Sequence, residues 1–152
     1  MYPFLRTSVI VFTAAVLLSS CVKVEVAPPL SPYAGSWVLT ESVEGDAYGW
    51  WPLYTGLEQG VFYFDNSGVA TYTDGGVTMR GNWYLQTVSG GFFDEYGSYV
   101  NRPHEQMQVQ LYDSYSHSSI NLSFDNVHMY GSYFYATYFN GTLIERYRFS
   151  RY

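Results

Sequence analysis

The chain has 152 residues, of which 47% are hydrophobic and 13% are charged, and its formal net charge is −6 at pH 7. Its 17 Tyr, 10 Phe and 4 Trp supply ample material for a buried core, so disorder is excluded for most of the chain. Only seven basic residues stand against 13 acidic ones. So few positive charges cannot neutralise a phosphate backbone, and we expect no nucleic-acid binding.

Residues 1–20 have the pattern of a secretion signal. Arg6 supplies a positive charge, and the apolar run from Val9 to Leu18 is too short to span a bilayer, which needs roughly 20 residues. The run ends in Leu18-Ser19-Ser20-Cys21, which resembles the lipobox of bacterial lipoproteins. The resemblance implies cleavage before Cys21 and attachment of lipid to its thiol, whereas the alternative is an ordinary buried cysteine. Cys21 is the single cysteine of the sequence, which excludes disulfides and cysteine zinc sites.

Residues 21–32 are expected to be the lipidated cysteine and a spacer. Pro28, Pro29 and Pro32 make the end of this segment a stiff, extended connector. Val22 follows the cysteine where some lipoproteins carry aspartate, and the family resemblance therefore favours the outer membrane without deciding the leaflet. We expect a cell-envelope protein whose partner is the membrane, reached through the N-terminal lipid.

Residues 33–152 are expected to form one all-β domain. In the segment Gln106–Leu111, apolar Met, Val and Leu alternate with three glutamines, which is typical of a strand with one buried face. Ile120–Phe124 repeats the alternation, and Asp125-Asn126 is expected to turn the chain.

Other turn signals separate further short strands. Asp65-Asn66-Ser67-Gly68, Asp74-Gly75-Gly76 and Asn140-Gly141 have the composition of tight turns. If Val127–Phe139 is one strand bent at Gly131, the domain has about eight strands joined mainly by hairpins. Eight strands are enough for an antiparallel up-and-down meander to close into a small barrel.

Two long connections are expected to interrupt the meander and to carry exposed aromatic side chains. One runs from Glu44 to Gly60 and the other from Thr87 to His104. Aromatic residues in loops are candidate lids or contact surfaces. The candidate ligand-binding residues are Trp50, Trp51, Phe92, Phe93 and Tyr96.

The domain resembles the lipocalin-like domains of bacterial envelope lipoproteins over about Tyr33 to Tyr152. The resemblance depends on four segments: Gly35-Ser36-Trp37, the hairpin Phe64–Tyr72, Gly81–Leu85 and the closing Tyr147–Arg151. It implies a lipocalin-like barrel in which the indole after the opening glycine packs at the closed end beneath an arginine of the last strand. The structural cap would then comprise Gly35 and Trp37 with Arg148 or Arg151, and such a cation–π contact contributes roughly 0.5–2 kcal/mol.

The sequence gives little indication of an active site or a metal site. His104, His117 and His128 lack the spacing of a zinc site, and we expect them in loops or facing solvent. Asp94-Glu95 could join Glu41, Glu44 or Asp46 in a carboxylate pair, but solvated loop acids are the simpler interpretation. We therefore expect a protein that is not an enzyme and uses neither metal nor cofactor.

Two functions remain, and they belong to different classes. The first is a membrane-anchored lipoprotein that binds a small hydrophobic or amphipathic ligand inside its barrel. The alternative is a surface interaction module with a filled barrel, whose aromatic loops contact a glycan or a protein. An enzyme using loop carboxylates is a weaker third hypothesis. An empty apolar interior would favour the carrier, and a solid one would favour the interaction module.

Overall fold

The structure of the protein is a computed structural model that describes residues 30–46 and 48–152, where all regular structure is β. Over these ranges no helix is long and apolar enough to cross a membrane. Cys21, the lipobox and the spacer as far as Pro29 lie outside the described residues. The strands are β1 (Gly35–Asp46), β2 (Gly49–Pro52), β3 (Val61–Phe64), β4 (Val69–Asp74), β5 (Val77–Phe93), β6 (Tyr99–Tyr112), β7 (Ser119–Tyr130), β8 (Tyr133–Phe139) and β9 (Ile144–Arg151).

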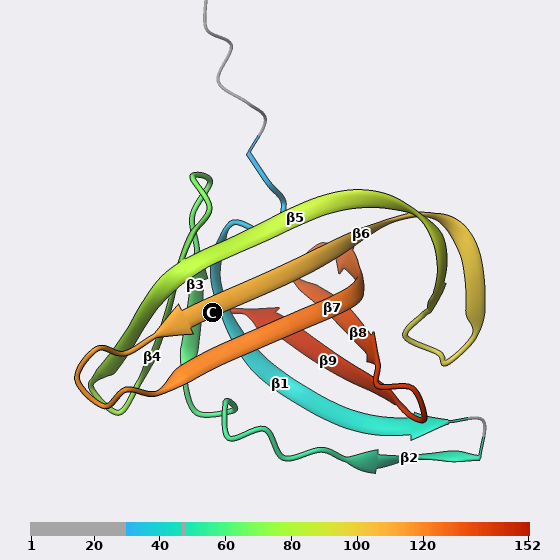
Figure 1. The fold of residues 1–152 in the computed structure, drawn as a ribbon, viewed down its shortest axis with the longest axis horizontal. Helices are drawn as coiled ribbons and strands as arrows, with labels where there is room; N and C mark the ends of the chain where they lie inside the picture. Colours follow the sequence, from blue (N-terminus) through green and yellow to red (C-terminus); the bar gives the residue numbers. More distant parts are fainter. Residues whose placement is uncertain (1–29, 47) are drawn as a thin grey trace, which may run out of the picture.

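The sheet is an antiparallel meander that closes on itself. Its order is β2-β1-β3-β4-β5-β6-β7-β8-β9, and β1 also pairs with β9, from Trp37 opposite Arg151 to Gly45 opposite Ile144. The ring therefore contains eight strands, while β2 adds to the C-terminal half of β1 outside it (Figure 1). This confirms the predicted all-β, barrel-like fold. Closure pairs the strand edges, whose free backbone groups would otherwise promote aggregation.

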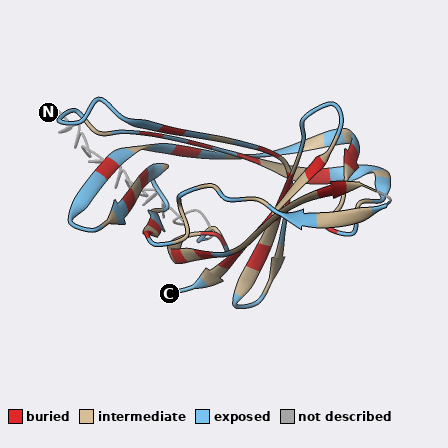
Figure 2. Ribbon diagram, turned by 90° about the horizontal axis from the view of Figure 1, so that it is seen from below, coloured by how far each residue is buried: buried red, intermediate tan, exposed pale blue. Residues whose placement is uncertain are grey.

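Strand alternation builds the core. On β6, Met107, Val109 and Leu111 are buried and the intervening glutamines are exposed, as the sequence pattern predicts. Figure 2 shows buried residues interspersed with intermediate and exposed ones along the strands. Aromatic rings fill the centre, and the stacked pair Phe134 and Phe149 has ring centroids 4.8 Å apart.

Two local predictions are wrong. Val127–Phe139 is not one bent strand, because the chain reverses at Gly131 (φ +68°) and Ser132 between β7 and β8. Asp125-Asn126 is not a turn but lies within β7, at an irregularity in its pairing with β6. Such a bulge changes the face of the sheet to which the following side chains point, and Val127 is buried in the core.

The second long connection is also shorter than predicted. β5 and β6 stay paired from Arg80 opposite Tyr112 to Phe93 opposite Tyr99, so most of the segment Thr87–His104 is strand. β4 pairs with β5 only up to Asn82, and the outer half of the β5–β6 hairpin extends as an arch beyond the ring (Figure 1). The first long connection likewise contains β2, which includes Trp50 and Trp51.

Candidate functional site

One end of the ring is closed by a cap that includes three of the predicted residues, Gly35, Trp37 and Arg151. Trp37 is fully buried, the guanidinium of Arg151 lies 4.1 Å from the centre of its ring, and its indole N–H donates to the Tyr33 carbonyl at 2.7 Å. Arg151 also donates to the carbonyls of Ala34 (2.7 Å) and Pro32 (2.8 Å). A side chain at Gly35 would collide with this guanidinium, since a Cβ there would lie 2.1 Å from Nη1.

Arg148, the other arginine considered for the cap, lies elsewhere. Its guanidinium is 4.4 Å from the centre of the Tyr133 ring and not beside Trp37. The reason is strand parity: Tyr147 and Phe149 point to the core, so Arg151 shares their face and Arg148 points away.

A partly buried polar pair next to this cap was not predicted from the sequence. The Tyr33 hydroxyl donates to the Glu105 carboxylate at 2.8 Å, and the Tyr33 ring meets the edge of Phe134. Burial, followed by the hydrogen bond to Glu105 and its negative charge, raises the pKa of Tyr33 above its ordinary value.

The predicted aromatic loops pack on the barrel rather than standing free. Phe92 is only 4% exposed, and its ring lies 4.2 Å from the ring of His104, which is also buried. The expectation that Phe92 is an exposed loop residue and that His104 faces solvent is therefore wrong. The continued pairing of β5 and β6 buries both side chains within the arch. Phe93 is half-buried and contacts Phe139, while Tyr96 is exposed.

Trp50 is held by an arginine that links several strands. Arg146 of β9 lies 4.6 Å from the Trp50 ring centre, forms a 3.5 Å ion pair with Glu41 and donates to the Glu95 carbonyl at 2.9 Å. The tip of the β5–β6 hairpin thus reaches β9 and β2. Trp51, the neighbour of Trp50, is exposed.

The candidate carboxylates serve local structure. Asp94 accepts hydrogen bonds from the amides of Tyr96 and Ser98 and so shapes the hairpin turn, while Glu95 accepts one from the Tyr130 hydroxyl. Glu44 lies opposite Glu145 across β1 and β9, where Glu145 accepts a hydrogen bond from Tyr147. Within the described ranges no three His, Cys, Asp or Glu side chains are placed to hold a metal ion.

The barrel interior is filled with side chains. The largest fully buried ones include Trp37, Phe62, Phe64, Phe134 and Phe149. A pocket of about 230 Å³ between β7 and the β8–β9 pair reaches the core residues Phe124 and Tyr147.

A polar surface lies on the outer face of β5, β6 and β7; its central rows are uncharged, and Arg80, opposite Tyr112, stands on the same face beyond them. Its residues align in cross-strand rows: Asn82 lies opposite Gln110, Tyr84 opposite Gln108 and Gln86 opposite Gln106. β7 extends the rows, with Asn121 opposite Gln110 and Ser123 opposite Gln108. We call this surface the amide face; it comprises Asn82, Tyr84, Gln86, Gln106, Gln108, Gln110, Asn121 and Ser123.

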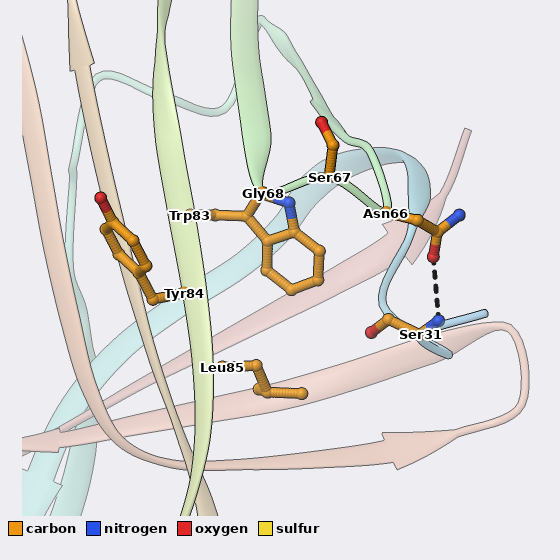
Figure 3. A pocket seen from close by; sticks show the side chains of 7 residues that line it. All are labelled: Ser31, Asn66, Ser67, Gly68, Trp83, Tyr84 and Leu85. Carbon is orange, nitrogen blue, oxygen red and sulfur yellow. Dashed lines mark hydrogen bonds between the residues drawn. The ribbon is translucent and has the colours of Figure 1, made fainter. Parts of the chain in front are cut away.

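The amide face is hollowed beside Tyr84. A pocket of about 320 Å³ is lined by Tyr84, Gln86, Gln106 and Gln108, and the Gln86 amide donates to the Gln106 side-chain oxygen at 3.1 Å. Tyr84 is 54% exposed. It also borders a second pocket of about 330 Å³, which Asn66 and Ser67 line. Figure 3 shows Tyr84 and Trp83 on opposite sides of β5, with Trp83 turned toward the β3–β4 turn.

No known protein family, curated protein or solved structure matches this chain. The alternating glutamines of β6 are recognisable in the sequence, but the amide face is not, because only the register between β5 and β6 places Tyr84 beside them.

Proposed function

We propose that this protein is a membrane-tethered surface interaction module that makes its contacts through the exterior of a filled barrel. The observation that carries the proposal is the packed interior, in which aromatic rings occupy the space that a carried ligand would need. The membrane anchor is the lipid predicted at Cys21, which brings the domain to the cell envelope without contributing to recognition.

The contact surface favoured by the geometry is the amide face rather than the two aromatic loops. Phe92 is buried and Trp50 is stacked on Arg146, so neither ring is free for a partner without local rearrangement. Tyr84 and its neighbouring glutamines are exposed and line a hollow. A small-molecule carrier remains the competing hypothesis.

Two measurements separate these functions. The mature chain carrying Cys21→Ser, which removes the lipid, is mixed with washed envelopes and sedimented, and is also titrated with an environment-sensitive lipid probe. We expect saturable sedimentation with envelopes and no saturable change in probe fluorescence. Saturable probe binding without sedimentation would overturn the proposal in favour of the carrier.

A further inference from the structure

We infer that the amide face binds a neutral polysaccharide, with Tyr84 as the residue on which a sugar ring stacks. This inference rests on the proposed function and specifies its partner. The evidence is the combination, on one hollowed face, of an exposed aromatic ring and side-chain amides on both flanking strands.

The hydrogen-bonding groups of the amide face favour one class of partner. Each glutamine or asparagine side chain offers two N–H donors and one carbonyl acceptor, and sugar hydroxyls both donate and accept. The Gln86–Gln106 bond uses one donor of Gln86 and one acceptor lone pair of Gln106, which leaves the remaining groups of the hollow available. A tyrosine ring supplies an apolar surface with a polar tip, suited to the less polar face of a sugar ring.

Charge argues against other partners. All eight residues of the amide face are uncharged, and Arg80 adds one positive charge in the next row of the same face, which is too little to complement a polyanion such as nucleic acid. Proteins usually bind through a patch with an apolar, desolvated centre. Here Tyr84 is the single large apolar side chain among the eight, and amides surround it. An uncharged, hydroxyl-rich chain complements this surface best.

The repetition of the rows indicates a chain rather than a single sugar. Asn82, Tyr84 and Gln86 follow one another along β5, each opposite a glutamine of β6, and β7 extends two of these rows. Successive rows of similar groups suit a ligand with repeating units. The pocket lined by Asn66 and Ser67 does not extend this surface, because Figure 3 shows these residues across β5 from the Tyr84 ring.

The test is affinity electrophoresis of the mature Cys21→Ser chain in native gels containing one polysaccharide each. The neutral probes are amylose, xyloglucan, mannan and a β-1,3-glucan, and polygalacturonate is the charged comparison. We expect retardation by at least one neutral polysaccharide and none by polygalacturonate. Tyr84→Ala should weaken that retardation about tenfold, and Gln108→Glu, which replaces N–H donors with a negative charge, should weaken it as well.

Tyr63→Ala is the matched control, because Tyr63 is 47% exposed but belongs to β3, outside the amide face. It should leave retardation unchanged, and urea unfolding should show both tyrosine variants to be folded. The inference is overturned if no neutral polysaccharide retards the chain, if polygalacturonate retards it most, or if the two tyrosine variants weaken binding equally.

Sedimentation with envelopes distinguishes a failure of this inference from a failure of the proposed function. Sedimentation that persists without polysaccharide binding rejects the glycan alone, whereas absent sedimentation rejects the interaction module.

Discussion

Trp37 is the residue on which the closed end depends most. Its indole is fully buried, donates to the Tyr33 carbonyl and lies under the Arg151 guanidinium. We expect Trp37→Ala to lower the free energy of unfolding by about 3–5 kcal/mol, because truncating a buried aromatic side chain leaves a cavity. Trp51→Ala, which alters an exposed ring, should change it by less than about 0.5 kcal/mol. Urea midpoints test this, and equal midpoints for the two variants would contradict it.

The hydrogen bond between the buried Tyr33 and the half-buried Glu105 predicts that the free energy of unfolding depends on pH in the alkaline range. The folded-state pKa of Tyr33 is raised above the ordinary value of 10.0 by burial and then by the hydrogen bond to Glu105. The folded chain thus holds this proton more tightly than the unfolded chain. The resulting stabilisation is complete below pH 10 and is lost as the pH rises from there toward the folded-state pKa.

The corresponding variant is Tyr33→Phe, which removes the titrating hydroxyl. Between pH 9 and pH 11 its free energy of unfolding should fall by about 1 kcal/mol less than that of the parent chain. Urea titrations at the two pH values measure this difference. Tyr115→Phe, a change at an exposed ring, should keep the parent pH dependence. An unchanged pH dependence in Tyr33→Phe would exclude Tyr33 as a source of alkaline unfolding.

Among the strands, the β5–β6 hairpin depends on Arg146 to hold its tip. Arg146 bonds to the Glu95 carbonyl, pairs with Glu41 and stacks on Trp50. Arg146→Ala should therefore lower the free energy of unfolding by about 1–3 kcal/mol. Hydrogen exchange should accelerate at the tip amides of Gly97 and Ser98 before it changes in the ring.

Arg80→Ala is the control for this prediction, because Arg80 lies on the exposed side of β5 at the far end of the same hairpin. It should leave exchange at the tip unchanged. If Arg146→Ala alters the exchange of the ring strands as much as that of the tip, the hairpin tip is not a separately held element.

The elements show which sequence signals suffice and which do not. Period-two alternation located the buried faces of β6 and β7 because one side of each strand meets the core. The same parity argument applied to β9 would have chosen Arg151 over Arg148 for the cap. The turn predicted at Asp125-Asn126 is wrong because residues that favour turns are equally compatible with a bulge inside a strand. The burial of Phe92 could not be predicted, since it depends on how far β5 and β6 remain paired.

At the scale of the whole molecule, the hairpin spacing predicted closure of a meander of about eight strands, whereas β2 was not predicted and the turn before β8 was placed at the wrong residues. The candidate site was not predicted. The amide face joins residues of β5, β6 and β7. Which residues lie side by side on it depends on the register between β5 and β6 and on that between β6 and β7, and the sequence of one strand does not determine either. The filled interior could be anticipated from the large residues at inward positions. The placement of Tyr84 over a hollow could not, because a hollow depends on the side chains of neighbouring strands.

The predicted lipid anchor would join the barrel at the cap. The described chain enters the barrel at the closed end, where Arg151 binds the carbonyls of Pro32 and Ala34. A lipid at Cys21 would therefore attach the barrel through a segment that ends at this cap. The core that the structure describes is built from Tyr33 and residues after it. We therefore expect folding of the barrel not to depend on lipid attachment at Cys21.

We accordingly expect Cys21→Ser to abolish lipid attachment while leaving the barrel folded. In the cell, the variant should accumulate as an uncleaved or soluble form, since cleavage and lipidation both require the cysteine of the lipobox. Its purified mature chain should keep a β-type circular dichroism spectrum. Membrane fractionation and intact mass measure the first effect, and Ser20→Ala, which keeps the cysteine and another small residue before it, is the control. A Cys21→Ser variant that still fractionates with membranes and has the same processed mass would show that Cys21 is not the anchor, because neither property could then depend on its thiol.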